Sequence, residues 1–426
     1  MTLELKKLAE YKDIMERCLR CSMCKWIPQV QIKSWKYAQV CPSIDEYNFH
    51  AYSGGGRMII ALSLLTERIG YSDELLNIIY RCTSCGACSV SCKYLNDLEP
   101  LEVIEALRKK VIEDGVGPLP AHKKYMQLTE EVHNPYGDTH SKRLAWLPAD
   151  VKVSKNAELA YFVGCTTSYR RKEIAVATTR ILNKAGVEFQ LLGEEEFCCG
   201  SPILRAGAEE RVKSLIKRNI DKFKDRGIKK VITSCAGCYS TMKADYPRYY
   251  KHDIEILHTS ELLEQLLKEG KLKLTKKVPL TVTYHDPCHL GRCSEPYKEW
   301  HGQIMEPISL VRFPVPPKPI RQGTYGCYYP PRNVLKAIPG LTLIEMERIK
   351  EYAYCCGAGG GVKAAFPDFA LNTASRRVEE AQDTGAKVLA SCCPFCSTNL
   401  KDAIEANKIN MKFYDLTELV LMAMED

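Results

Sequence analysis

Cysteine is the residue type whose number and spacing suggest chemistry in this chain of 426 residues, which contains 21 of them. In a reducing compartment, many cysteines indicate metal or redox chemistry rather than disulfides. Eighteen of the cysteines fall into spacings that are typical of iron–sulfur clusters. The sequence therefore predicts about four clusters and a role in moving electrons.

The N-terminal part contains eight cysteines in two groups. One group has the spacing C-x2-C-x2-C-x3-C, in which three thiolates hold one 4Fe–4S cluster and the fourth reaches a second cluster. The other group is C-x2-C-x2-C, and its fourth cysteine is delayed by a gap of sixteen residues to Cys41, which precedes Pro42. Two zinc sites are the alternative, but the repeated triplet argues against them. The predicted ligand sets are Cys18, Cys21, Cys24 and Cys92 for one cluster, and Cys82, Cys85, Cys88 and Cys41 for the other.

The rest of the chain is a duplication. Residues 231–235 match 388–392, residues 198–200 match 355–357, and residues 260–263 match 417–420, always at an offset of 157 residues. Each copy contains a set of five cysteines with an adjacent pair followed by glycine. The first set is Cys165, Cys198, Cys199, Cys235 and Cys238, and the second is Cys288, Cys355, Cys356, Cys393 and Cys396.

Adjacent cysteines do not easily hold one ordinary cubane from neighbouring backbone positions, but they suit a more open cluster with a bridging thiolate. Glycines beside them let the backbone approach inorganic sulfur and donate N–H groups. We predict this role for Gly200, Gly357, Gly359 and Gly360.

Two histidines flank a predicted ligand in His285-Asp286-Pro287-Cys288-His289. Hydrogen bonding around the cluster or packing at a strand end is the favoured interpretation. Proton donation to a departing thiolate is the alternative, because imidazole titrates near neutrality.

Three cysteines remain outside these sets. Cys392 aligns with Cys235 by the offset of 157 residues, but Cys393 fits the two-residue gap before Cys396. We choose Cys393, and Cys392 stays the alternative. Cys293 and Cys327 are interpreted as buried or incidental thiols, with a redox pair or additional ligands as the alternative.

With these motifs the chain resembles the family of heterodisulfide reductase catalytic subunits of the D type. The resemblance implies a ferredoxin-type domain with two 4Fe–4S cubanes and two cysteine-rich CCG domains, each with a non-cubane 4Fe–4S cluster. It also implies that the ten cysteines of the duplicated sets are catalytic, and that electrons pass from the cubanes to a disulfide, which is reduced, or formed in the reverse reaction. Redox partner subunits, either a flavoprotein or a membrane haem b or quinone-type subunit, are implied as well.

A second hypothesis is a non-catalytic electron-transfer subunit of a larger redox complex, of an aromatic-ring reductase, flavoprotein-linked or quinone-linked type. The long gap before Cys41 is a departure that fits such a specialised subunit. A nucleic-acid-binding protein is disfavoured because basic residues do not cluster. No dinucleotide-binding glycine motif follows a predicted strand, so a flavin or nicotinamide is expected on another subunit.

Three regions must position these residues, giving an α+β multidomain chain. Residues 1–115 are expected to form a mainly α ferredoxin-like domain, with a helix beginning at Pro100 and another capped by Ser72. Two α/β CCG domains are expected at 157–275 and 276–426. Their predicted strands are 159–163, 187–192 and 231–233, and then 280–284, 341–345 and 388–390.

Two segments are expected to be irregular. Residues 116–156 are rich in proline and are predicted as a linker on the surface, with one short helix as an option. The second copy has a proline-rich insertion near 293–327, predicted as a loop for docking or for covering the site.

The net charge of +8 fits an acidic partner, an anionic substrate or a surface beside anionic lipid. No apolar run reaches the length of a membrane span, and the N-terminus lacks the apolar core of a signal peptide. A cytoplasmic protein is expected, with attachment to the membrane face through a partner as an option.

Overall fold

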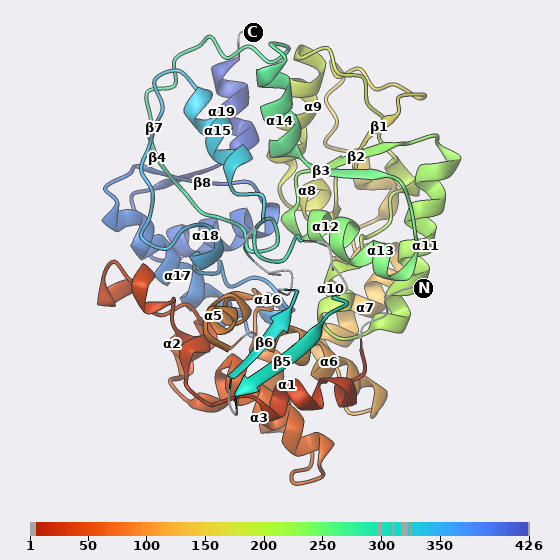
Figure 1. The fold of residues 1–426 in the computed structure, drawn as a ribbon. Helices are drawn as coiled ribbons and strands as arrows, with labels where there is room; N and C mark the ends of the chain where they lie inside the picture. The colour runs from red at the N-terminus through yellow and green to blue at the C-terminus, as the bar shows by residue number, and fades with distance from the viewer. Residues whose placement is uncertain are drawn as a thin grey trace.

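The computed structural model describes residues 6–96, 98–295, 300–308, 311–316, 323 and 325–424. Figure 1 shows the two halves of the duplication side by side, with the N-terminal helices packed across one end of both. The α+β prediction is confirmed, because helices surround two small parallel sheets.

The N-terminal region is helical, as predicted. Ser72 caps a helix by accepting a hydrogen bond from the Leu75 backbone N–H at 3.2 Å, and Pro100 begins the next long helix. The helices are α1 (Lys12–Glu16), α2 (Pro42–Tyr47), α3 (Gly54–Leu65), α4 (Asp73–Tyr80), α5 (Ala87–Asn96) and α6 (Pro100–Glu113).

The first CCG unit contains a three-stranded parallel sheet in the order β1-β2-β3. The predicted strand at 187–192 is reduced to a single bridge between Gln190 and Ala160, and β3 was not predicted. The elements are β1 (Leu159–Tyr161), α8 (Cys165–Tyr169), α9 (Lys172–Lys184), α10 (Ser201–Arg205), α11 (Glu209–Asp225), β2 (Lys230–Thr233), α12 (Ala236–Ser240), α13 (Tyr246–Tyr249), β3 (Glu255–His258) and α14 (Thr259–Lys268).

The second unit repeats this topology in the order β7-β4-β8-β9, with β7 at the place of the Gln190 bridge. Of its strands, β9 was not predicted. The elements are β4 (Thr281–Tyr284), β5 (Gln303–Ile308), β6 (Val311–Val315), α15 (Tyr329–Ala337), β7 (Thr342–Leu343), α16 (Val362–Ala365), α17 (Pro367–Asp383), β8 (Val388–Ser391), α18 (Pro394–Ala406), β9 (Lys412–Asp415) and α19 (Leu416–Ala423).

The two units pack through equivalent helices. Helix α14 of the first contacts α15 of the second, and α19 of the second contacts α9 of the first. Both α14 and α19 follow the last strand of their sheet and begin with a capping box, at His258 with Glu261 and at Asp415 with Glu418. This reciprocal packing turns the carboxyl ends of both sheets toward one shared region.

The segment 116–156, predicted as a surface linker, is instead built into the protein. It forms α7 (Pro120–Val132), and His122, Met126 and Arg143 are fully buried. Tyr125 and Met126 of α7 belong to the same hydrophobic core as the CCG units, and the His122 ring lies edge-on to that of Tyr80 in the ferredoxin-like region, with centroids 4.9 Å apart. Its proline and glycine content marks turns between these contacts rather than a free surface strand.

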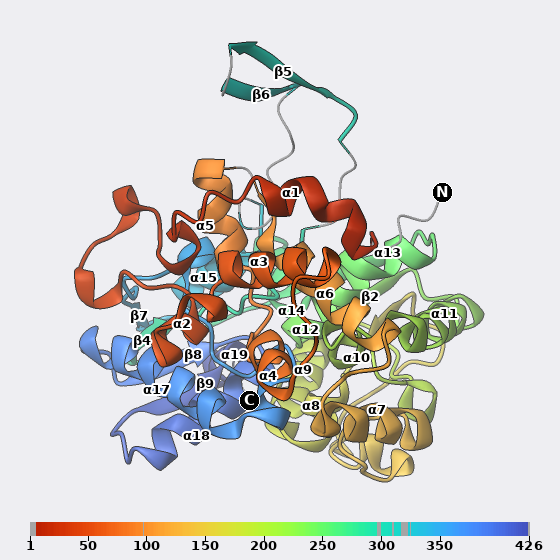
Figure 2. The ribbon, with the colours of Figure 1, turned by 90° about the horizontal axis from the view of Figure 1, so that it is seen from below.

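The insertion in the second copy, predicted as a loop, contains the antiparallel pair β5 and β6. Figure 2 shows this hairpin standing away from the rest of the molecule. Both strands of this hairpin are edge strands, and proline is tolerated in an edge strand because its missing N–H need not bond to a second neighbour. The connecting residues 296–299, 309–310, 317–322 and 324 lie outside the described part of the chain.

The buried imidazole of His122 predicts a pH-dependent stability. Its Nε2 donates to the Gly361 carbonyl at 3.1 Å, and burial, with a smaller effect of Arg108, lowers its pKa from 6.5 to about 4. The unfolded state therefore binds a proton first as the pH falls. The folded state should lose about 2 kcal/mol of stability between pH 7 and pH 5.

Thermal unfolding under anaerobic conditions at both pH values measures this effect. The His122→Gln variant keeps an N–H donor and has no titratable group, so its unfolding midpoint should fall less on acidification. An equal fall in both proteins would show that His122 is not responsible.

Candidate iron–sulfur sites and shared cavity

The eight N-terminal cysteines surround two small hollows in the combinations predicted from their spacing. Helix α5 supplies a thiol to each hollow, Cys92 to one and Cys88 to the other. One hollow is lined by Cys18, Cys21, Cys24 and Cys92, and the other by Cys41, Cys82, Cys85 and Cys88.

The unusual gap before Cys41 forms a closed loop. The Ile27 N–H donates to the Ala38 carbonyl at 3.0 Å, and the Val40 N–H donates to the Lys25 carbonyl at 2.9 Å. These bonds return the chain close to its starting point. Cys41 then precedes α2 and faces the second hollow despite its distance in sequence.

Two glycines at the start of α3 separate these hollows, and neither was predicted to have a role. The Gly55 N–H donates to the Cys24 sulfur at 3.3 Å. A Cβ on Gly54 would lie only 2.7 Å from the Cβ of Cys88. The run Gly54-Gly55-Gly56 was the available signal, because such close approaches exclude side chains.

A larger cavity of about 290 Å³ lies between the two CCG units and is also lined by Tyr125, Pro135 and Tyr136 of the segment 116–156. Nine of the ten cysteines of the duplicated sets line it. They are Cys165, Cys198, Cys199, Cys235 and Cys238 from the first set, and Cys288, Cys356, Cys393 and Cys396 from the second. The structure therefore brings both sets to one enclosed space, since the sheets end on opposite sides of it.

Cys355, the tenth, points instead toward the ferredoxin-like region. Its thiol interacts with those of Cys85 and Cys288, and the interaction with Cys355 is the largest cause of the raised pKa of Cys85. Cys85 belongs to the second N-terminal set. The second CCG set thus lies in direct contact with one N-terminal set.

The adjacent cysteines Cys392 and Cys393 have different surroundings. Cys393 lines the cavity and interacts with Cys235 and Cys396. The Cys392 sulfur lies 2.9 Å from the Tyr284 hydroxyl, away from the cavity lining. This arrangement favours Cys393 over Cys392 as the ligand.

The other two leftover thiols have separate neighbours. The Cys293 sulfur donates to the Cys85 carbonyl at 3.5 Å, whereas the Cys327 sulfur lies 3.9 Å from the Ser260 hydroxyl. These contacts favour incidental thiols over a redox pair.

The glycine after each cysteine pair has the same conformation in both copies. Gly200 and Gly357 have φ of 86° and 88°, which disfavours any residue with a Cβ. Their N–H groups donate to the sulfurs of Cys198 and Cys355, both at 3.4 Å. Such bonds stabilise a thiolate.

Gly359 and Gly360 line the cavity, and a close approach to the ferredoxin-like region also excludes a side chain at both positions. A Cβ on Gly359 would lie 2.6 Å from the Thr83 carbonyl oxygen, and one on Gly360 would lie 2.4 Å from that of Cys82. Both glycines therefore let the second unit pack onto the ferredoxin-like region.

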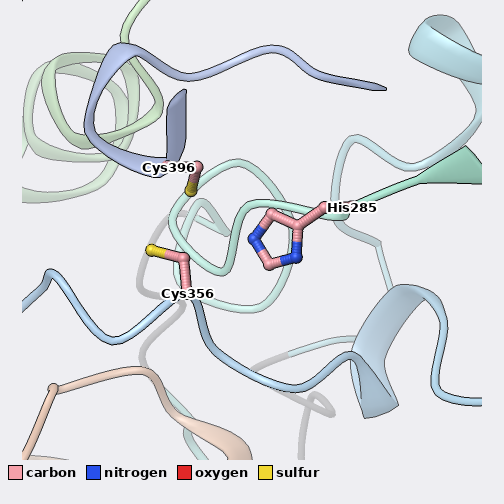
Figure 3. A group of neighbouring side chains, drawn as sticks. All are labelled: His285, Cys356 and Cys396. Carbon is pink, nitrogen blue, oxygen red and sulfur yellow. The ribbon is translucent and has the colours of Figure 1, made fainter. Parts of the chain in front are cut away.

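Of the two predicted histidines, His285 is fully buried and His289 is half-buried. His289 lines the cavity and its Nε2 donates to the Ser84 carbonyl at 3.3 Å, while burial lowers its pKa to about 4. His285 lies beside Cys356 and Cys396 (Figure 3), and burial lowers its pKa to about 3. Neutral, hydrogen-bonded rings favour a positioning role for both.

Arg143 is a site residue that was not predicted. It is buried, pairs with Glu196 at 2.7 Å and donates to the Cys165 sulfur at 3.5 Å. Glu196 in turn accepts the backbone N–H groups of Val163 and Gly164 at 2.9 and 2.8 Å. Nothing in the spacing of the motifs marks Arg143, because it belongs to the segment interpreted as a linker.

The residues present fit iron–sulfur clusters. All 21 cysteines are free thiols. Both N-terminal sets and nine of the ten duplicated cysteines converge on these hollows, and backbone N–H groups donate to the sulfurs of Cys24, Cys198 and Cys355. Buried thiols with no disulfide among them are typical of thiolate ligands for such clusters.

Comparison with protein families agrees with this architecture. Residues 14–95 match the 4Fe-4S dicluster domain family, and residues 159–243 and 321–401 match the Cysteine-rich domain family, CCG. The described residues contain no helix that is both long and apolar enough to span a membrane.

Several curated relatives cover most of the chain. The D-type subunit of the dihydromethanophenazine:CoB–CoM heterodisulfide reductase of Methanosarcina acetivorans is 37% identical over 96% of this chain and 94% of its own length. The EtfAB:quinone oxidoreductase of Syntrophomonas wolfei is 32% identical over 85% of this chain and 48% of its own length.

A crystal structure of a hypothetical protein from Helicobacter pylori has a TM-score of 0.54 and 13% identity, and the match covers 98% of this chain and 76% of that one. At this identity the likeness concerns the fold alone. The domain matches and the extent of the match to the Methanosarcina subunit show that the chain belongs to the family of D-type heterodisulfide reductase subunits, which are iron–sulfur oxidoreductases.

Proposed function

We propose that the chain holds two cubane and two non-cubane 4Fe–4S clusters and uses them to reduce a disulfide, or to form one in the reverse reaction. The observation that carries this proposal is that nine of the ten duplicated cysteines, from both sets, line one cavity. The cubane ligands would be the two N-terminal sets. The ligands of the non-cubane clusters would be the ten duplicated cysteines.

The reaction needs two electrons and two protons for each disulfide, which yields two thiols. Clusters of this kind supply electrons singly and offer iron to sulfur. The chain itself would hold the reacting sulfurs in a cavity lined mostly by cysteine, glycine and apolar side chains, together with Arg205, His289 and Lys363. Its two-fold arrangement would present cysteines of one set to each sulfur of the disulfide.

The order of the sets suggests a direction for the electrons. Cys21 is exposed, whereas all the other thiols of the N-terminal region are buried or half-buried. A redox partner subunit would deliver electrons at the set that includes Cys21. The Cys85–Cys355 contact would then lead from the second N-terminal set to the second CCG set.

The partner is proposed to be a flavoprotein or a membrane haem b or quinone-type subunit. Relatives named as subunits of a heterodisulfide reductase and a fumarate reductase, and as an EtfAB:quinone oxidoreductase, support such partners. The last of these also favours the second candidate function, an electron-transfer subunit without disulfide chemistry.

Anaerobic purification with iron and sulfide analysis and EPR tests the proposal. We expect about sixteen irons per chain and a paramagnetic species when a thiol is added to the oxidised protein. The S-methylated form of the same thiol is the matched control and should give no such species. About eight irons would contradict the two non-cubane clusters, and about sixteen irons without a thiol-dependent signal would favour the second function.

A further inference from the structure

His285 has an unused hydrogen-bond donor position in the buried interior of the second unit. Its side chain is fully buried, and its Nε2 has no hydrogen-bond partner within the described part of the chain. Ligand atoms of His285, Cys356 and Cys396 all lie within 4.8 Å of one another. Figure 3 shows the ring nitrogen farther from the backbone pointing toward the two cysteines.

The hydrogen bond at Nδ1 of His285 determines which ring nitrogen carries the proton. Arg377 Nε donates to His285 Nδ1 at 3.1 Å. A guanidinium has no acceptor, so Nδ1 must offer its lone pair and the proton of the neutral ring must be on Nε2. Glu380 holds Arg377 in place through an ion pair of 2.5 Å.

This tautomer decides between two roles for the ring. To coordinate iron, Nε2 would need a free lone pair, and the proton would then have to move to Nδ1, facing the Arg377 N–H. Two donors would oppose each other in a buried place, which would leave both without an acceptor. The ring is therefore arranged to donate a hydrogen bond from Nε2 rather than to bind metal.

The first unit lacks this donor. Strand pairing places Tyr161 beside Ile232 and Tyr284 beside Ala390. Ile232 and Ala390 are equivalent, because the residues that follow them, Thr233 and Ser391, pair with the equivalent cap residues His258 and Asp415. The next residue along each strand is Phe162 in the first unit and His285 in the second, and both donate their backbone N–H to the neighbouring strand, at Ile232 and Ala390. A phenylalanine side chain has no N–H group, so the two cysteine sets differ at this position.

We infer that His285 donates a hydrogen bond from Nε2 to a sulfur of the second set, at Cys356, Cys396 or the inorganic sulfide they hold, and that this makes the second cluster easier to reduce than the first. The inference rests on the proposed function. A donor at a cluster sulfur stabilises the extra negative charge of the reduced form. The second set is also the one that contacts the N-terminal set through Cys355.

Pulsed EPR on the unmodified protein, reduced so that the second cluster is paramagnetic, gives the first test. With ¹⁵N-labelled histidine, we expect a weak nitrogen coupling together with a proton coupling that disappears in D₂O. A strong nitrogen coupling, as for a directly bound imidazole, would overturn the inference. So would the absence of any histidine coupling.

Redox titration of variants gives the second test. His285→Leu should make the second cluster three- to tenfold harder to reduce, which corresponds to a potential lowered by about 30 to 59 mV. In His285→Gln, whose side chain can still donate an N–H, the potential of the second cluster should fall less. Phe162→Leu is the matched control in the first unit and should leave the potential of the second cluster unchanged.

The outcomes separate this inference from the proposed function. Iron content near sixteen with an unchanged potential in His285→Leu would overturn the role of His285 alone. Iron content near eight in the unmodified protein would overturn the proposed function. If His285→Leu loses iron, the nitrogen coupling in the unmodified protein decides between donation and coordination.

Discussion

Replacing Cys393 by serine should remove one cluster and abolish disulfide reduction. Cys393 is buried, lines the shared cavity and interacts with Cys235 and Cys396, one from each set. Since a serine hydroxyl is a poor ligand for iron, the iron content should fall by about four per chain. Activity should fall by more than about 100-fold, because even partners of metal ligands contribute factors of that order.

Cys392→Ser is a closely matched control, because it makes the same change one residue earlier. The Cys392 sulfur contacts the Tyr284 hydroxyl, and a serine hydroxyl can keep a hydrogen bond there. Iron content and activity should therefore stay near those of the unmodified protein. Loss of iron from C392S with retention in C393S would reverse our choice of ligand.

Replacing Arg108 by methionine should loosen the attachment between the ferredoxin-like region and both CCG units. Arg108 is fully buried on α6. It donates to the Cys82 carbonyl at 2.7 Å in its own region, to the Arg205 carbonyl at 2.7 Å in the first unit and to the Gly360 carbonyl at 3.0 Å in the second. A single guanidinium thus joins all three parts of the chain.

Methionine keeps much of the volume but leaves these carbonyl groups without a donor. Each buried, unsatisfied group costs about 1–3 kcal/mol, so the total loss should exceed about 4 kcal/mol. Thermal unfolding and limited proteolysis between the regions measure it. Clusters should also be lost more readily, because Cys82 belongs to a predicted ligand set.

Lys110→Met provides the control, since it removes one positive charge from the same helix. Lys110 pairs with Asp114 at 2.9 Å in a partly exposed position, and such pairs contribute about 0.3–0.5 kcal/mol. The unfolding midpoint of the Lys110→Met variant should hardly change. A comparable fall in K110M, or no fall in R108M, would contradict the role assigned to Arg108.

Features that depend on local spacing could be predicted from the amino-acid sequence. Triplets of cysteines at two-residue intervals define the N-terminal sets, because the geometry of a cubane fixes the spacing of its ligands. The offset of 157 residues identified the duplication. The positive φ of Gly200 and Gly357 could be expected for the same reason, since a close backbone approach after a cysteine pair excludes a Cβ.

Short edge strands and the role of proline-rich segments were harder to predict. β3 and β9 are four residues each and lie beside a single neighbour, so their apolar pattern is weak. The segment 116–156 resembles a linker by composition, yet it contributes α7 and buried Arg143. Its burial depends on surfaces contributed by residues far away in the chain, which local patterns do not contain.

Which cysteines meet across the units follows from the packing of distant segments. Cys355 and Cys85 are far apart in the sequence, and their contact depends on how the second unit docks on the N-terminal helices. Likewise, the proton of His285 is placed by Arg377, from helix α17. Spacing selects ligands within one segment, whereas contacts between distant segments arise from packing, and these contacts set the order and the asymmetry of the sites.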